Sequence, residues 1–131
     1  MTFYCALKMA GKYDFDTDKV FVRVPKYAAF ICGTSACLRN AEYIRLTDLF
    51  YALMLPSGND AACTLANFFG YLDLRRNTSP SAFFSEVENK ELMELYDLSS
   101  EGDIRFQHPQ GDVQMNMRNF VKIMNTEAQR L

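Results

Sequence analysis

The sequence predicts one mainly α-helical domain with one or two short strands, and three observations lead to this fold class. Apolar residues recur at helical spacing in three segments, at residues 47–55, 60–69 and 117–131. One run only, V-F-V-R-V at residues 20–24, has the β-branched, weakly alternating pattern of a strand. The chain has 131 residues, 49% of them hydrophobic, which is enough for one buried core but not for two independent ones.

The chain begins with the end of a predicted helix over residues 2–10, and Gly11 is its expected stop signal. The strand over residues 20–24 follows and ends at Pro25, which cannot donate to a sheet ladder. Residues 26–31 are then expected to form one or two helical turns.

Three aspartates alternate along the chain before that strand, at Asp14, Asp16 and Asp18. The pattern D-x-D-x-D begins a calcium-binding loop, which also needs glycine at its sixth position and glutamate at its twelfth. Lys19 and Pro25 occupy those two positions. We therefore predict a solvated acidic turn and no metal site.

A helix is predicted over residues 48–55, with Thr47 as its N-cap and with Pro56 and Gly58 ending it. Four residues of this helix share one face and are expected to be buried. They are Leu49, Phe50, Leu53 and Met54.

A second helix is predicted directly after the first, over residues 60–69. Asn59 is its expected N-cap, Asp60 lies at its positive end, and Gly70 closes it. Ser57 therefore lies at the bend of a helix–turn–helix.

The next segment, residues 71–115, carries four Lys/Arg and nine Asp/Glu. This acidic composition favours a segment that lies on the surface over one that contributes to the core. A Ser-Pro pair at residues 79–80 predicts a helix that runs to about Tyr96. Residues 99–112 are predicted to be loop. Short extended pieces are expected there around Ile104 and Phe106.

An amphipathic helix over residues 117–131 is predicted to close the chain. Five apolar residues recur on roughly one face of it and are expected to pack against the rest. They are Phe120, Val121, Met124, Ala128 and Leu131.

Composition and charge exclude several classes of function. The formal net charge is −2 and no Lys/Arg run occurs, so a nucleic-acid partner is not expected. The longest apolar run, residues 49–56, is far shorter than the roughly 18 residues of a membrane span. We expect no transmembrane segment, and the short apolar patch at residues 3–7 is interrupted by Lys8 and is no signal peptide. Met1 need not be the start of the parent gene.

The cysteines identify no site by their spacing. Cys32 and Cys37 are separated by four residues and the chain has a single histidine, His108, which does not match a zinc site. We expect all four cysteines, which include Cys5 and Cys63, to be buried free thiols. A Cys32–Cys37 disulfide is the alternative that the spacing leaves open. No cofactor is predicted.

Residues 57–59, Ser-Gly-Asn, taken alone are typical of a tight turn. Their surroundings are more specific. The run T-D-L-F-Y-A-L-M at residues 47–54, followed by L-P-S-G-N-D-A-A at residues 55–62, resembles the S-x-N segment of serine-type D-alanyl-D-alanine carboxypeptidases. These are penicillin-binding proteins of peptidase family S11, which trim peptidoglycan.

Two further runs resemble the same family, in the order that the family has them. G-T-S-A-C-L at residues 33–38, a predicted loop, is similar to its G-T-S-A-x-L loop. N-F-V-K-I-M-N at residues 119–125, with Ala128 and Leu131, is similar to its F-V-x-x-M-N-x-x-A-x-x-L helix. The resemblance covers roughly residues 1–70 and 116–131.

This resemblance implies that residues 1–131 form the helical part of an α+β, β-lactamase/transpeptidase-like domain, with an acidic insertion at about 71–115. The family transfers acyl groups with a serine and three motifs, S-x-x-K, S-x-N and K-T-G. By resemblance, Ser57 is a proton relay and Asn59 is an amide that binds the substrate peptide. The implied partners of the full-length parent are peptidoglycan-type peptides ending in D-Ala-D-Ala and β-lactams. The family is usually exported to the cell envelope.

The other two motifs are missing from the chain. None of its seven serines precedes a lysine by three positions, and no lysine is followed by Thr-Gly or Ser-Gly. In the family a Met-Thr-like pair commonly follows S-x-x-K, so the nucleophile is expected a few residues before Met1, and K-T-G well beyond Leu131. Loss of the nucleophile costs a serine hydrolase about 10⁶-fold in kcat. We therefore predict that this chain alone is inactive.

The sequence leaves three other interpretations open. The missing motifs fit a non-catalytic pseudoenzyme or a helical interaction module of the same fold. A β-lactamase-like hydrolase also uses S-x-N, but the amino-acid sequence of residues 55–62 is more similar to that of the carboxypeptidases. A Ser57–His108 pair is disfavoured, because Ser57 lacks the G-x-S-x-G elbow and His108 lies in the insertion.

Overall fold

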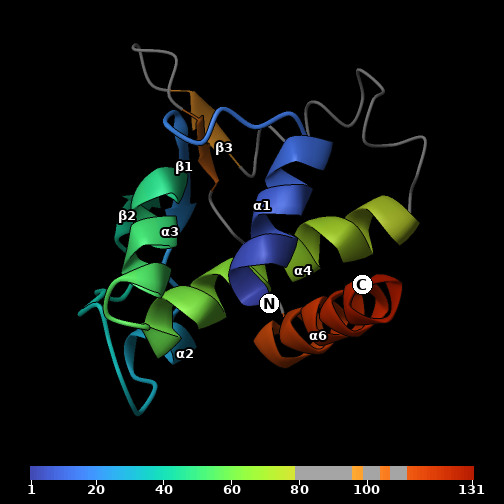
Figure 1. The fold of residues 1–131 in the computed structure, drawn as a ribbon. Helices are drawn as coiled ribbons and strands as arrows, with labels where there is room; N and C mark the ends of the chain where they lie inside the picture. Colours follow the sequence, from blue (N-terminus) through green and yellow to red (C-terminus); the bar gives the residue numbers. More distant parts are fainter. Residues whose placement is uncertain (79–95, 99–103, 107–111) are drawn as a thin grey trace.

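The computed structural model describes residues 1–78, 96–98, 104–106 and 112–131, and Figure 1 shows how they are arranged. Helices account for most of these residues and the strands are short, so the predicted mainly α class is confirmed. In chain order the elements are α1 (Thr2–Lys12), β1 (Val20–Arg23), α2 (Lys26–Ala29), β2 (Tyr43–Arg45), α3 (Leu46–Met54), α4 (Asn59–Thr78), β3 (Tyr96–Leu98), β4 (Ile104–Phe106) and α6 (Val113–Arg130).

Helix α4 forms the centre of the molecule, with α1, α3 and α6 packed against it (Figure 1). Because neighbours cover it on more than one side, its buried residues do not form a single stripe. Phe68, fully buried in this helix, makes ring contacts with Phe69, Phe106 and Phe15 at centroid distances of 4.9, 5.0 and 6.1 Å. Burial of such aromatic side chains is the main favourable contribution to the fold.

The strands form one small mixed sheet in the order β2-β1-β4-β3. Strand β1 pairs antiparallel with β2 and parallel with β4, and β3 pairs antiparallel with β4. The predicted strand at residues 20–24 and the extended piece around residues 104–106 are confirmed. Strand β2 was not predicted, and β3 begins at Tyr96, where a helix was expected to end; strands of three residues are too short to show an alternation.

Of the three glycines predicted to end a helix, Gly58 follows the end of α3 as expected, whereas Gly11 and Gly70 lie inside helices. Helix α1 continues through Gly11 to Lys12, and α4 continues through Gly70 to Thr78. A Cβ atom at Gly70 would overlap the backbone carbonyl of Asn116 in α6. The glycine is therefore required for the close approach of two helices and not for a C-cap.

Helix α3 also differs from its prediction. It begins at Leu46, and the hydroxyl of Thr47 donates to Asp18 Oδ1 at 2.8 Å instead of capping the helix. Leu49 and Phe50 are buried as expected, whereas Met54 is 57% exposed because it lies at the open end of the helix.

The buried face of α6 is more polar than predicted. The helix begins at Val113, capped by Asp112, and its buried side chains are Asn116, Phe120 and Glu127. Of the expected apolar face, Phe120 is buried and Met124 is half-buried, while Val121, Ala128 and Leu131 are exposed. The reason is that the polar residues have partners inside the protein: Asn116 Nδ2 donates to Asn67 Oδ1 at 2.9 Å, and Glu127 pairs with Lys8.

Three predictions fall wholly or largely on residues outside the described ranges. They are the body of the helix expected from residue 79, the loop expected over residues 99–112 and the position of His108. Within the ranges that are described, no helix has both the length and the apolar composition needed to cross a bilayer.

Candidate functional site

The predicted corner between two consecutive helices is formed. Helix α3 ends at Met54 and α4 begins at Asn59, with Ser57 between them in the left-handed backbone region at φ +54°. The amide of Gly58 donates to the carbonyl of Ala52 at 3.3 Å, which closes the turn against the end of α3. The side chains of Ser57 and Asn59 are both exposed, whereas Gly58 is buried.

A loop from a distant part of the chain holds this corner in place. The Thr34 hydroxyl donates to the Ser57 carbonyl at 2.6 Å, and the Asn59 amide donates to the Thr34 carbonyl at 2.8 Å. The side-chain amide of Asn59 donates to the Cys32 carbonyl at 3.1 Å. This loop and the corner belong to two of the three runs that carry the family resemblance, and they contact each other directly.

Asp60, one residue after the corner, connects the same loop to the start of α4. Its side chain is 1% exposed and accepts hydrogen bonds from Ser35 Oγ at 2.7 Å and from the amides of Ala36 and Leu38 at 3.0 Å each. The amide of Ala61 also donates to it at 2.9 Å. Burial opposes its ionisation, but these hydrogen bonds outweigh burial and lower the pKa of the Asp60 carboxyl.

Two glycines allow the loop and the corner to approach this closely. Gly33 has φ +103°, and a Cβ there would overlap the side-chain amide of Asn59. A Cβ at Gly58 would lie 2.7 Å from Asp60 Oδ1 and 2.8 Å from the carbonyl oxygen of Ala52. Any larger residue at either position would force the corner and the loop apart.

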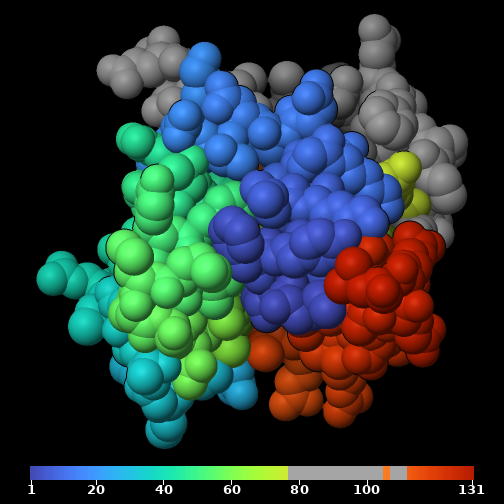
Figure 2. Space-filling model, in the orientation of Figure 1, coloured from blue at the N-terminus to red at the C-terminus, as the bar shows by residue number. Residues whose placement is uncertain are grey.

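Ser57 and Asn59 share a groove of about 280 Å³ with the first residues of α1. Met1, Thr2 and Phe3 form one wall of it, and the end of α3 with the turn forms the other. In Figure 2 the N-terminal residues, in dark blue, adjoin the green residues of α3 and the turn. The sequence thus placed both candidate residues correctly at one exposed corner.

The groove supplies hydrogen-bonding groups but no base. The Ser57 hydroxyl makes no hydrogen bond with any described residue, so it is free to donate or accept. The lining side chains that the structure describes include no lysine, histidine, aspartate or glutamate. A serine needs such a neighbour to act as a nucleophile at neutral pH, so these residues alone can orient a substrate and relay a proton but cannot start acyl transfer.

The roles of Thr34, Ser35 and Asp60 were not predicted. Asp60 was assigned to the positive end of α4, which it does occupy, but its bonds to the loop at residues 35–38 were not foreseen. The available signal was an aspartate in a first helical turn together with a loop rich in small polar residues, since such loops present free amides to a carboxylate.

The cysteines divide into two pairs. Cys5 and Cys63 are buried free thiols as predicted, and burial raises the pKa of each. Cys32 and Cys37 are exposed, which corrects the prediction that all four are buried, because both lie in the loop that wraps the corner. They too are free thiols, so the alternative of a disulfide between them is not found. Over the described part of the chain, no group of three His, Cys, Asp or Glu side chains is placed to hold a metal ion.

Comparison with known proteins returned no family model and no curated protein that matches this chain.

Proposed function

We propose that this chain is the helical part of a serine-type D-alanyl-D-alanine carboxypeptidase, an acyl-transfer hydrolase that trims peptidoglycan. In this proposal Ser57 relays the proton towards the leaving group, and Asn59 binds the backbone of the substrate peptide. The observation that carries the proposal is that Ser57 and Asn59 line one exposed groove whose opposite wall is the beginning of α1.

The geometry suits these roles for a physical reason. Ser57 and Asn59 sit on a turn between two helix ends, and three hydrogen bonds from the loop at residues 32–34 fix that turn. Side chains held in this way lose little conformational freedom when a substrate binds. The Asn59 amide keeps one N–H and its carbonyl oxygen for a substrate, because only one N–H is used by Cys32.

The position of α1 supports the expected place of the nucleophile. Met1 and Thr2 border the groove, so the start of α1 lies beside Ser57. This is where the resemblance puts an S-x-x-K motif, whose lysine would activate its serine. The proposed substrates of the complete enzyme are peptides ending in D-Ala-D-Ala, with β-lactams as the reagents that trap the acyl-enzyme.

Benzylpenicillin provides a test on the 131-residue chain itself. We expect mass spectrometry of the treated chain to show no covalent adduct, because the groove contains no activated nucleophile. An adduct on Ser57 would contradict its assignment as a proton relay.

The parent protein provides the positive test. The transcript is read on both sides of this segment, and an in-frame S-x-x-K upstream and K-T-G downstream are expected. The complete protein is then assayed for release of D-alanine from diacetyl-L-lysyl-D-alanyl-D-alanine.

We expect Ser57→Ala to lower kcat by about 10²-fold or more, as loss of a proton-transfer group does. Thr126→Ala removes an exposed hydroxyl on α6 and is the matched control, with activity unchanged. Equal activity of the two variants would contradict the proposal.

One observation favours a second candidate, a non-catalytic member of the same fold. The chain contains neither S-x-x-K nor K-T-G. Reading the transcript separates this candidate from the carboxypeptidase, because flanking sequence without these motifs supports the non-catalytic protein. The assay of the parent protein tests a third candidate: hydrolysis of β-lactams instead of D-Ala-D-Ala peptides would support a β-lactamase-like enzyme.

A further inference from the structure

A second hollow, larger than the groove at Ser57, lies between α1, α4 and α6. Its volume is about 500 Å³, within the range of small-molecule binding sites. Its apolar part is formed by Cys5, Met9 and Ile123, of which the first two are 1% and 5% exposed. No lining residue is shared with the groove at Ser57, so its chemistry is independent of the proposed acyl transfer.

Positive charge exceeds negative charge around this hollow, in a chain whose net charge is −2. Two basic residues come from α1 and two from α6, while α4 and α6 contribute one carboxylate each. The basic residues are Lys8, Lys12, Lys122 and Arg130, and the acidic ones are Asp73 and Glu127.

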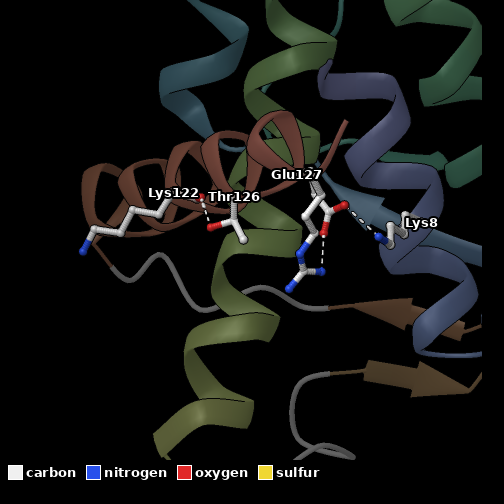
Figure 3. A network of polar contacts seen from close by, with 5 residues as sticks. Lys8, Lys122, Thr126 and Glu127 are labelled. Carbon is white, nitrogen blue, oxygen red and sulfur yellow. Dashed lines mark hydrogen bonds and ion pairs between the residues drawn. The ribbon is translucent and has the colours of Figure 1, made fainter.

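Both carboxylates already have partners within the protein. Glu127 accepts from Lys8 Nζ at 2.7 Å and from Arg130 Nη1 at 3.3 Å, as Figure 3 shows. Asp73 accepts from the Asn119 side-chain amide at 2.9 Å. The charge of Glu127 is therefore already shared between two cations.

Lys12 and Lys122, by contrast, make no ion pair with any residue that the structure describes. Both are exposed and line the hollow from different helices. Figure 3 shows the Lys122 side chain extending away from Lys8 and Glu127. Two ammonium groups that form no ion pair with a described residue, beside an apolar floor, favour a ligand that has an oxyanion at one end and an apolar body at the other.

We propose that the hollow between α1, α4 and α6 binds a small molecule that carries one carboxylate or phosphate group on an apolar body. Lys12 and Lys122 attract the oxyanion, with the exposed Lys122 side chain turning towards the hollow when the ligand binds, while Cys5, Met9 and Ile123 contact the body.

Phenyl phosphate is the probe that tests this site, with phenol as its neutral counterpart. The full 131-residue chain, ¹⁵N-labelled, is titrated with each compound, and the amide signals are followed by NMR. We expect phenyl phosphate to shift signals of α1 and α6 saturably and phenol to shift them far less. Lys12→Gln and Lys122→Gln should each weaken binding about threefold, and the double variant about tenfold, as expected for exposed charge pairs.

The matched control is Lys19→Gln, which removes an exposed lysine that does not line this hollow and should leave the dissociation constant unchanged. All three substituted lysines are exposed, so their replacement by glutamine does not put folding at risk. Equal weakening by Lys19→Gln, equal binding of phenol, or no saturable shift on α1 and α6 would each overturn the proposal.

Discussion

Asp60 holds its carboxylate inside the protein without a cation from any described residue beside it. Three backbone amides and the Ser35 hydroxyl supply its hydrogen bonds instead. We predict that Asp60→Ala lowers the free energy of unfolding by about 3 kcal/mol, because buried donors lose their acceptor. Urea denaturation measures the change. Asp48→Ala, which removes an exposed carboxylate in the first turn of α3, should cost less than about 1 kcal/mol; equal losses would show that Asp60 does not fasten the loop.

The depressed pKa of Asp60 also predicts a dependence of stability on pH. The folded protein holds this pKa below its value in the unfolded chain, since the loop amides favour the charged form. Its contribution is therefore fully present above the unfolded pKa of about 3.9 and is lost as the pH falls through the lower folded value. We expect the stability difference between the wild type and Asp60→Asn to be constant from about pH 7 to pH 5. Urea titrations at lower pH should show it shrinking, whereas a constant difference down to about pH 2 would contradict the assignment.

The packing of α4 on α6 depends on the absence of a side chain at Gly70. Alanine has the higher helix propensity, by about 1 kcal/mol, but its Cβ would overlap the Asn116 carbonyl, which is backbone and cannot rotate away. We predict that Gly70→Ala destabilises the protein by about 2 kcal/mol. Gly11→Ala is the matched control, because a Cβ at Gly11 in α1 has no atom within 4 Å. That variant should be stabilised by up to about 1 kcal/mol, and thermal unfolding of both distinguishes the two effects by sign.

The predictable elements were those whose cause is local in the sequence. The corner at Ser57 follows from turn chemistry in four adjacent residues, and the strand β1 from a β-branched run. The hydrogen bonds from the loop at residues 32–38 join groups more than twenty positions apart, so no local pattern indicates them. The prediction of an apolar buried face for α6 was wrong for the same reason. Asn116 and Glu127 are buried because they have partners on α4 and α1.

Over the described residues, the neighbouring helices α1 and α3 expose several large apolar side chains. Helices α1 and α3 are in contact through the rings of Phe3 and Phe50, 5.5 Å apart, and they adjoin in Figure 2. Their large exposed apolar residues are Met1, Tyr4, Leu7, Tyr51 and Met54, and Leu55 follows in the turn. Exposed apolar surface of this extent marks a region that another surface covers. In the proposed carboxypeptidase it would be covered by the sheet against which these helices pack.

We therefore predict that the isolated 131-residue chain associates with itself at high concentration through the face formed by α1 and α3. Leu7 and Tyr51 are 48% and 60% exposed, so replacing both with lysine removes apolar surface without opening the core. Sedimentation velocity should show the Leu7→Lys/Tyr51→Lys variant monomeric at a concentration where the wild type is not, with similar thermal stability. The added charge alone could reduce association, so the control places two lysines at exposed polar positions of α6, Asn125→Lys and Gln129→Lys. If this control also became monomeric, net charge and not the apolar face would govern association, and the argument that a sheet covers this face would lose its support.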